Sequence, residues 1–378
     1  MKFAFVLFSY FPFGGLQQDM LKIARACHDR NVEVTVFCME WQGEIPHFIK
    51  VVLRSGQGFT KVARRSCFVD QVLEATVNDF DLVLGFNKMP GLDYYYAADY
   101  CFAEKAFNER NALYRMTARA RQYLDFEASV FGENEDTVAL LLSPSQSEEF
   151  FRHYHTPSER LVTLPAGIKK DRRYSQDSLA KRMMLRYQFN IGKEELLVLQ
   201  IGSAFKTKGL DRSLQAFAAL PDTLRQNTYF YVIGEDEPEK YLHMASLLGV
   251  EKHFKILQGR SDVPDFLQAA DVLIHPSIKE SAGMVIVEAI VAGLPVLCTD
   301  TCGYAFHVKK AEAGYICSSP FQQDELDRQL QSVLRDEAQR QKWKENGIAY
   351  GRNNDLYSMP ETVAAILVQA ASAYVHQA

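Results

Sequence analysis

Short apolar runs alternate with longer amphipathic stretches along most of the chain. The runs suit strands that are buried on both faces of a sheet, and the stretches between them suit helices that cover those faces. Such alternation predicts a parallel α/β architecture. The expected strands are 3–8, 33–37, 49–53, 81–85, 138–142 and 161–164 in the first half, and 196–201, 228–233, 254–257, 272–275 and 295–299 in the second half.

The alternation breaks at a polar and basic stretch that spans residues 169–177. A chain of 378 residues usually divides into two domains, because a single core stops growing at about 250–300 residues. We therefore expect two domains, with the crossing between them near residues 166–178.

Composition narrows the class of protein. A hydrophobic fraction of 47% with 24% charged residues is typical of soluble globular proteins, and a net charge of −5 argues against general nucleic-acid binding. The seven cysteines include no C-x-x-C pair, which suits reduced, buried thiols and does not support a zinc site. No apolar run approaches the roughly 20 residues that span a bilayer. The apolar residues 2–8 indicate a first buried strand rather than a signal peptide.

Glu280 and Glu288 are the most informative pair of residues, with seven residues between them. A Ser-Ala-Gly break and an apolar run follow Glu280, and Gly293 and Pro295 end the run, which predicts one short buried helix. The free N–H groups at its start suit a phosphate. If both carboxylates were helical they could lie up to roughly 12 Å apart, at about 1.5 Å rise per residue. That separation suits the two ends of a nucleotide sugar better than one glycosidic bond.

Other candidate residues follow predicted strands. Gly14 and Gly15 would let the backbone approach a pyrophosphate, and Asp19 lies one turn into the following helix. The G-x-G-x-x-G fingerprint of dinucleotide binding is missing, so a dehydrogenase is the least favoured interpretation. Arg172 and Arg173, at the domain crossing, could bind phosphates bidentately, although a solvated basic linker would look the same.

These features resemble the retaining glycosyltransferases of family 4 over essentially the whole chain. Gly14-Gly15, a loop ending in Lys208-Gly209, the Arg260 loop and the E-x7-E pair occur in the order and spacing of that family. The resemblance implies the GT-B fold, with two facing Rossmann-like, doubly wound domains and a cleft between them. Residues 1–168 would bind the acceptor, with a C-terminal helix in 357–378 packing back onto them, and residues 169–356 would bind the nucleotide-sugar donor.

The resemblance also implies roles for single residues. Glu280 would bind the donor sugar near its reacting carbon, Glu288 would hold the ribose hydroxyls, and Lys208 would neutralise the donor diphosphate. Lys208 and Asp19 join Glu280 as candidate catalytic residues. The remaining donor-site candidates are Gly14, Gly15, Arg172, Arg173, Arg260, Ala282, Gly283, Met284 and Val285. No metal or other cofactor is expected, because the resembling fold needs none.

Residues 10–17, 85–93 and 97–105 resemble one branch of the family, the lipopolysaccharide core glucosyltransferases of Gram-negative bacteria. This resemblance implies glucose transfer from UDP-glucose to an inner-core heptose of a lipid-linked core oligosaccharide. It places the enzyme in the cytoplasm, peripherally associated with the inner membrane. Asn87, Lys88 and Asp99 would then line the acceptor side.

Residues 101–124 carry their own signal for a membrane surface. Aromatic and aliphatic residues are interleaved with Lys105, Arg110, Arg115, Arg119 and Arg121. A basic amphipathic segment of this kind can lie on an anionic leaflet. An ordinary helix with a solvated basic face is the alternative.

Two other functions stay open at this point. One keeps the fold and the UDP-sugar but changes the reaction, to a sugar-nucleotide epimerase, a phosphorylase or a transferase with another donor or acceptor. The other is a non-catalytic, membrane-associated scaffold that retains a nucleotide pocket. Glucose and galactose differ at one hydroxyl, so the choice of donor rests on contacts that the residue pattern does not encode.

Overall fold

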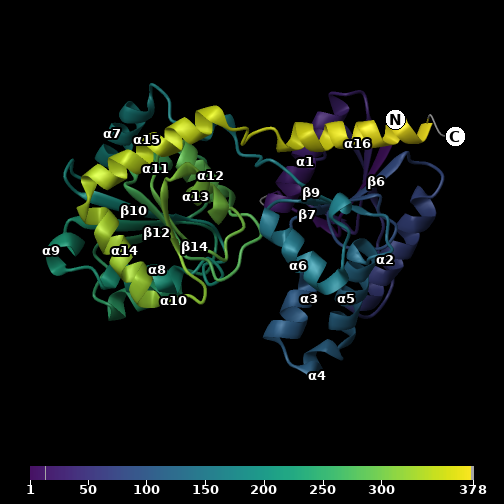
Figure 1. Ribbon diagram of the computed structural model, residues 1–378, viewed down its shortest axis with the longest axis horizontal. Helices are drawn as coiled ribbons and strands as arrows, with labels where there is room; N and C mark the ends of the chain where they lie inside the picture. Colours follow the sequence, from purple (N-terminus) through teal and green to yellow (C-terminus); the bar gives the residue numbers. More distant parts are fainter. Residues whose placement is uncertain (13, 376–378) are drawn as a thin grey trace. The chain divides into compact units, whose positions relative to one another are not determined.

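The computed structural model describes residues 1–12 and 14–375, drawn in Figure 1. Phe13, beside the expected Gly14-Gly15 turn, and residues 376–378, at the end of the expected C-terminal helix, lie outside this description. The chain forms two compact units, one of residues 1–167 with 358–378 and one of residues 168–357. The first unit thus ends at 167, beside the expected boundary at 168.

The first unit is built on a seven-stranded parallel sheet with the order β5-β3-β1-β6-β7-β8-β9. From β1 the chain first adds strands on one side and then, from β6, on the other, which is a doubly wound arrangement with its switch point between β1 and β6. A separate parallel pair, β2 with β4, continues beyond β1 and β3. The strands are β1 (Lys2–Val6), β2 (Ser9–Tyr10), β3 (Glu33–Cys38), β4 (Glu40–Trp41), β5 (Ile49–Leu53), β6 (Leu82–Gly85), β7 (Tyr94–Ala97), β8 (Val138–Leu141) and β9 (Leu161–Thr163).

The helices of the first unit include one that comes from the far end of the sequence. Helix α16 contacts α1, and the Arg30 guanidinium just beyond α1 donates to the Glu361 carbonyl oxygen at 3.3 Å. Figure 1 shows these two helices side by side. The helices are α1 (Gly15–His28), α2 (Lys61–Thr76), α3 (Phe102–Glu104), η1 (Lys105–Glu109), α4 (Ala112–Arg115), α5 (Ala118–Phe131), α6 (Pro144–Tyr154), η2 (Ser158–Arg160) and α16 (Met359–Val375).

The second unit repeats the architecture with a six-stranded parallel sheet of order β12-β11-β10-β13-β14-β15, whose switch point lies between β10 and β13. Its strands are β10 (Leu196–Ile201), β11 (Thr228–Ile233), β12 (Phe254–Leu257), β13 (Val272–His275), β14 (Val296–Thr299) and β15 (Gly314–Cys317). Its helices are η3 (Lys170–Arg172), α7 (Ser178–Gln188), α8 (Leu210–Ala218), α9 (Asp222–Arg225), α10 (Glu239–Leu247), α11 (Val263–Ala269), α12 (Met284–Val291), α13 (Ala305–Ala311), α14 (Gln323–Arg335) and α15 (Glu337–Asn353).

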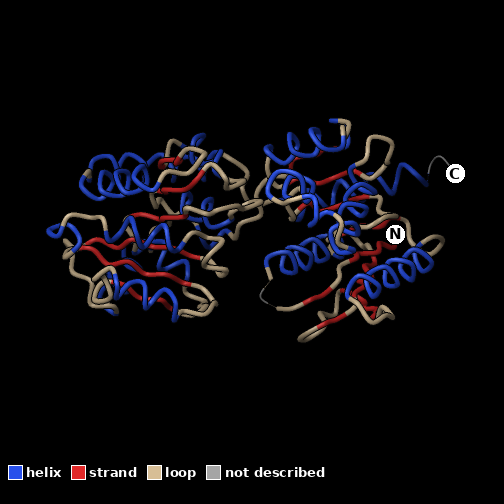
Figure 2. Tube along the Cα trace, turned by 90° about the horizontal axis from the view of Figure 1, so that it is seen from below, coloured by secondary structure: helices blue, strands red, loops and turns tan. Residues whose placement is uncertain are grey.

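Both faces of the second sheet are buried, which explains its continuous apolar strands. On β10, Leu197 and Leu199 pack in one core cluster with α7, α11, α12 and α13, whereas Val198 packs in another with α8, α10 and α14. Successive side chains of a strand point to opposite faces, so an apolar run serves two cores at once. Figure 2 shows the strands of each unit lying between layers of helices.

The expected strands agree closely with the structure, and those at 49–53, 196–201, 228–233, 254–257 and 272–275 match residue for residue. Strands β7 and β15 and the two-residue β2 and β4 were not predicted. β7 is the tyrosine-rich segment Tyr94–Ala97, and β15 is a half-buried edge strand, so neither stands out as an apolar run.

Candidate active site

The loops after β10 and β13 converge at the carboxyl edge of the second sheet, where parallel α/β sheets bind their ligands. The Ile278 amide donates to the Thr207 carbonyl oxygen at 2.8 Å and joins the two loops. Gly209 has φ +69°, and an added Cβ would lie 2.1 Å from the Pro276 carbonyl oxygen. Only glycine therefore allows the two loops to approach so closely, and this approach brings Lys208 to Glu280.

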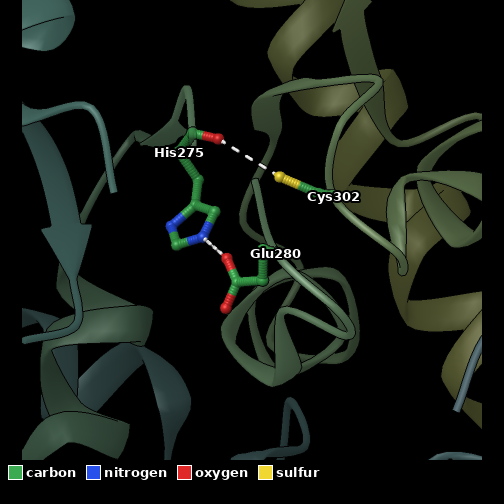
Figure 3. Close-up of side chains that lie close together, drawn as sticks. All are labelled: His275, Glu280 and Cys302. Atoms are coloured by element: carbon green, nitrogen blue, oxygen red, sulfur yellow. Dashed lines mark hydrogen bonds and ion pairs between the residues drawn. The ribbon is translucent and has the colours of Figure 1, made fainter. Parts of the chain in front are cut away.

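The Glu280 carboxylate has three partners. Its Oε1 is ion-paired with the Lys208 ammonium, and its Oε2 lies 2.5 Å from His275 Nε2 and accepts a hydrogen bond from the Ser277 hydroxyl at 3.1 Å. Figure 3 shows the imidazole pointing at the carboxylate. Burial raises the pKa of Glu280, but the attraction to His275 and Lys208 outweighs burial and lowers this pKa to about 2. Glu280 is therefore an anion at any physiological pH.

The backbone around Glu280 is held by the loop after β14. The Glu280 amide donates to the Thr301 carbonyl oxygen at 3.1 Å, and the Gly303 amide donates to the Glu280 carbonyl oxygen at 2.8 Å. The hydroxyls of Thr299 and Thr301 donate to the Ser277 carbonyl oxygen at 2.7 and 2.6 Å. The carboxylate thus rests on a loop that is fixed from a second strand.

His275, Glu280 and Cys302 place one potential metal ligand each within 4.8 Å of one another. The His275 and Glu280 atoms are hydrogen-bonded to each other, and the Cys302 thiol lies 3.7 Å from the His275 carbonyl oxygen, as Figure 3 shows. Burial and then the charge of Glu280 raise the pKa of the thiol to about 11, so it stays protonated. These three residues are joined by hydrogen bonds.

Helix α12 spans Met284–Val291, the apolar run that was expected to form the helix. Gly283 precedes it with φ +92°, and Glu280 lies in the loop before it, so the estimate for two helical carboxylates does not apply. Ala282, Met284 and Val285 are half-buried around the start of the helix.

Glu288 lies on α12 and is ion-paired with Arg172, whose Nε is 3.1 Å from the Glu288 Oε1. Both side chains remain partly exposed. The structure therefore joins one of the two arginines of the crossing to the second carboxylate of the E-x7-E pair.

Arg173 and Arg260 have other partners. The Arg173 guanidinium lies 4.0 Å from the centre of the Tyr357 ring and donates to the Gly351 carbonyl oxygen. The Arg260 guanidinium is bound to both oxygens of Asp262, which raises the pKa of Arg260. Within the described chain, neither arginine contacts the carboxylate pair.

In the first unit, Gly14 is the N-cap of α1, and an added Cβ would lie 1.9 Å from the Gln17 Oε1. At Gly15 an added Cβ would meet no atom within 4 Å. Asp19, a candidate catalytic residue, accepts hydrogen bonds from Lys22 at 2.8 Å and from the Tyr96 hydroxyl at 2.9 Å. Asp19 thus links α1 to the unpredicted strand β7.

The expected acceptor residues Asn87 and Lys88 are both engaged. The Asn87 Oδ1 accepts from the Phe8 amide at 2.7 Å, and the buried Lys88 ammonium lies 2.5 Å from the Glu127 Oε1. Burial raises the pKa of Glu127, but Lys88 outweighs it and lowers the pKa overall. These contacts assign Lys88 to the interior of the unit, which corrects the expectation that it lines an acceptor surface. Asp99, in the loop after β7, is exposed as a residue, but burial around its carboxyl raises the pKa of Asp99.

The basic segment 101–124 is not one amphipathic helix but the succession α3, η1, α4 and the first part of α5. Lys105 and Arg115 are half-buried, and the Arg115 guanidinium donates to the Ala106 carbonyl oxygen at 3.1 Å. The exposed members are Arg110, Arg119 and Arg121, together with the apolar Phe107, Leu113 and Met116. Among the described residues, no helix is both long enough and apolar enough to cross a bilayer.

Sequence and structure comparisons agree with this architecture. A model of the glycosyl transferases group 1 matches residues 183–350. Lipopolysaccharide glucosyltransferase WaaG of Escherichia coli (strain K12) is 42% identical over 367 residues, which cover 96% of this chain and 98% of that protein. A crystal structure of WaaG, a glycosyltransferase involved in lipopolysaccharide biosynthesis, matches with a TM-score of 0.89 at 41% identity and covers 96% of this chain and 99% of that one.

A more distant structure, Anabaena Alr3699/HepE in complex with UDP and glucose, matches with a TM-score of 0.74 at 19% identity and shares the fold alone. It covers 98% of this chain and 100% of that one. Two parallel α/β units of this kind define a glycosyltransferase of the GT-B class. Within that class, the chain belongs to the family of the lipopolysaccharide glucosyltransferase WaaG.

None of His275, Ser277, Thr299 and Cys302 was expected at the site, and Cys302 was expected only as a buried thiol. Each lies at or just after the carboxyl end of an expected strand, which is the signal that could have found them.

Proposed function

We propose that this chain is a retaining glucosyltransferase that moves glucose from UDP-glucose onto an inner-core heptose of lipopolysaccharide. The observation that carries the proposal is the half-buried Glu280 carboxylate, which contacts a lysine and a histidine at the ligand-binding edge of the second sheet. The 42% identity to a lipopolysaccharide glucosyltransferase over 96% of the chain supports the choice of reaction.

In this proposal Lys208 neutralises the donor diphosphate and stabilises the negative charge that develops on the departing UDP. A carboxylate with a pKa of about 2 is a very weak base, so Glu280 does not take the acceptor proton. Its charge instead orients the donor sugar and stabilises the positive charge that develops on the reacting carbon. Glu288, with Arg172 beside it, binds the ribose.

The acceptor hydroxyl then attacks the anomeric carbon from the side of the leaving group. The bond from that carbon to the phosphate oxygen breaks, the bond to the acceptor oxygen forms, and the proton passes to the departing phosphate. The configuration at the anomeric carbon is retained without a covalent enzyme intermediate.

In the proposed mechanism the reaction is independent of divalent metal, because the Lys208 ammonium supplies the positive charge at the diphosphate. Transfer measured with and without excess EDTA tests this point. Equal rates are expected, and loss of transfer that Mg²⁺ or Mn²⁺ restores would contradict it.

We further propose that the enzyme works on the cytoplasmic leaflet of the inner membrane through residues 107–121, where Phe107, Leu113 and Met116 are exposed beside basic residues. Leu113 and Leu247 are 73% and 75% exposed, which makes them a matched pair on different units. Leu113→Gln should weaken cosedimentation with phosphatidylglycerol vesicles by about tenfold if the side chain enters the bilayer, and Leu247→Gln should not. Equal behaviour of the two variants would overturn the proposal.

The test of the whole proposal combines donor titration with a transfer assay. Calorimetric titration with UDP, UDP-glucose, UDP-galactose, UDP-N-acetylglucosamine, GDP-mannose and NAD should show binding of UDP and of UDP-glucose. Glu288→Ala should weaken both, whereas Glu345→Ala, which removes an exposed glutamate of α15, should leave them unchanged. Glucose should then appear, with its configuration retained, on a heptose-terminated core glycolipid.

The alternative functions predict different results in the same assay. Consumption of the UDP-sugar without transfer to the glycolipid would indicate an epimerase, a phosphorylase or another acceptor. Binding of UDP with no turnover, and full in-cell function of Glu280→Ala, would indicate a nucleotide-binding scaffold.

A further inference from the structure

A basic cavity lies in the first unit, apart from every residue assigned above. It has a volume of about 260 Å³ and is lined by Ser9, Met39, Glu40, Ser55, Gly56, Lys61, Arg64 and Arg65. Three of these residues are cations and one is an anion, so the cavity carries a net positive charge.

The strands of the first sheet place this cavity at a ligand-binding edge. β5, β3 and β1 are neighbours in that order, and Ser55, Glu40 and Ser9 follow their carboxyl ends. Doubly wound sheets bind ligands beyond the carboxyl ends of their strands. The cavity therefore occupies the edge of the first sheet that corresponds to the Glu280 edge of the second.

The loop from β5 to α2 packs closely against α2, the helix that carries the three cations. An added Cβ at Gly56 would lie 1.8 Å from the Arg64 carbonyl oxygen, so only glycine allows this contact. The Thr60 hydroxyl accepts the Ala63 amide at 3.1 Å and caps the start of α2. Lys61 and Arg64, in the first turn of the helix, are held at the cavity by these contacts.

Two of the three cations are available to a ligand. Among the described residues, the charged groups of Lys61 and Arg64 have no hydrogen-bond or ion-pair partner, and neither is bound to Glu40. Arg65 is different, because its guanidinium donates to the Tyr123 hydroxyl at 2.6 Å and lies 5.1 Å from the centre of the Phe8 ring. The Arg65 guanidinium is thus held in place at the side of the cavity. The positive charges of Lys61 and Arg64 beside it are not neutralised.

We propose that this cavity binds an anionic group, a phosphate or a carboxylate, carried by a saccharide of the acceptor. Arginine and lysine are the side chains that recognise such oxyanions, and the hydroxyls of Ser9 and Ser55 and the carboxylate of Glu40 can bond the hydroxyls of the sugar. A volume near the lower end of ligand pockets, about 300 Å³, suits one charged sugar unit rather than a whole oligosaccharide. This inference rests on the proposed transfer to a glycolipid acceptor for its biological meaning, but the binding itself does not require transfer.

The test is a titration without donor, followed by two-dimensional NMR of the full-length protein. The probes are mannose 6-phosphate, galacturonic acid, mannose, inorganic phosphate and phosphatidylglycerol vesicles. Mannose 6-phosphate or galacturonic acid should shift the amide signals of Ser55 and Gly56, and the tighter of the two identifies the anionic group. Mannose should not shift them.

The variants are chosen to remove charge without disturbing the fold. Lys61→Gln with Arg64→Gln should weaken binding of the anionic sugar by about tenfold or more. Lys2→Gln with Lys50→Gln removes the same charge near the amino ends of β1 and β5 and should leave binding within about twofold. In the transfer assay, the first pair should raise the KM for the acceptor and leave the KM for UDP-glucose unchanged.

Three outcomes overturn the proposal. These are no shift with either anionic sugar, equal affinity for inorganic phosphate and mannose 6-phosphate, and charge-dependent binding of vesicles only, which would assign the cavity to lipid head groups. UDP is titrated on the same samples. If the wild-type protein does not bind UDP, the proposed function is refuted. If it binds UDP but neither anionic sugar, only this inference is refuted.

Discussion

Glu280 shows how single residues set the chemistry of this protein. Lys208 comes from the loop after β10 and His275 from the end of β13, and both lower the pKa of the half-buried Glu280 carboxyl. The two partners differ in kind, because the lysine adds a full charge next to one oxygen and the histidine directs an N–H at the other. Charge at this position is therefore built into the resting protein and does not depend on a ligand.

Glu280→Gln removes this charge and nearly preserves the shape of the side chain. We expect kcat to fall by about a hundredfold or more, as is usual when one preorganised electrostatic contact is lost, while UDP still binds. Steady-state kinetics and calorimetry measure the two effects. Glu325→Gln, a carboxylate bonded to Tyr315 and Ser318 in the same unit, is the control and should keep full activity.

The low pKa of Glu280 also predicts a dependence of stability on pH. Because the pKa in the folded protein, about 2, lies below the usual 4.5, the ionised carboxylate stabilises the fold fully above pH 4.5. That stabilisation is lost as the pH falls from 4.5 toward 2, and its size is on the order of 3 kcal/mol. The free energy of unfolding should therefore fall less steeply in Glu280→Gln than in the wild type below pH 4.5. Parallel curves in denaturant titrations at several pH values would refute this.

At the level of elements, the active-site loops depend on a few backbone positions. α8 begins after Gly209, and α12 begins after Gly283, and both glycines have positive φ. Each glycine ends the loop between a strand and the next helix, in a conformation that other residues rarely adopt. Lys208 lies immediately before Gly209 and Glu280 lies three residues before Gly283, so both side chains are placed by the loops that these glycines end.

Gly209→Ala should test this dependence, with Gly249→Ala as a matched control. The two glycines have φ +69° and +68°, but an added Cβ would lie 2.1 Å from the Pro276 carbonyl oxygen at Gly209 and would meet nothing within 4 Å at Gly249. The left-handed conformation costs alanine about 1–2 kcal/mol at either position, and the overlap adds about 1–3 kcal/mol at Gly209. Denaturant unfolding should show this difference, and only Gly209→Ala should weaken UDP binding. Equal losses of stability would show that the close approach of the loops does not matter.

At the level of the whole molecule, the last helix completes the first unit. α16 returns from the second unit and contacts α1, with Val363, Leu367 and Ala371 fully or almost fully buried. The first unit is therefore discontinuous in sequence, and its stability depends on the buried side chains of α16.

This arrangement predicts which unfolding transition responds to which change. Leu367→Ala should destabilise the first unit, and Leu330→Ala, on α14, should destabilise the second, each by about 2–5 kcal/mol. UDP at about a hundred times its Kd should stabilise the second unit by about 2.7 kcal/mol. Differential scanning calorimetry should then show that UDP moves the transition that Leu330→Ala lowers and not the one that Leu367→Ala lowers. A single transition that responds equally to both variants would contradict the prediction.

The pattern of apolar and polar residues determined most of the parallel strands, the division near residue 167 and the loops that carry Lys208 and Glu280. These features are local, because strand periodicity, glycine turns and helix ends each depend on consecutive residues. The E-x7-E spacing also identified Glu288 on the helix and Glu280 beside its start.

Only the tertiary structure decided the partners of these side chains. His275 and Ser277 reach Glu280, Lys88 reaches Glu127 rather than an acceptor, and Asp19 reaches Tyr96 on a strand that was not predicted. Such contacts depend on strand order, on register and on the depth to which each loop is buried. Periodicity along the chain carries information about the faces of an element, but not about the element that comes to lie against each face.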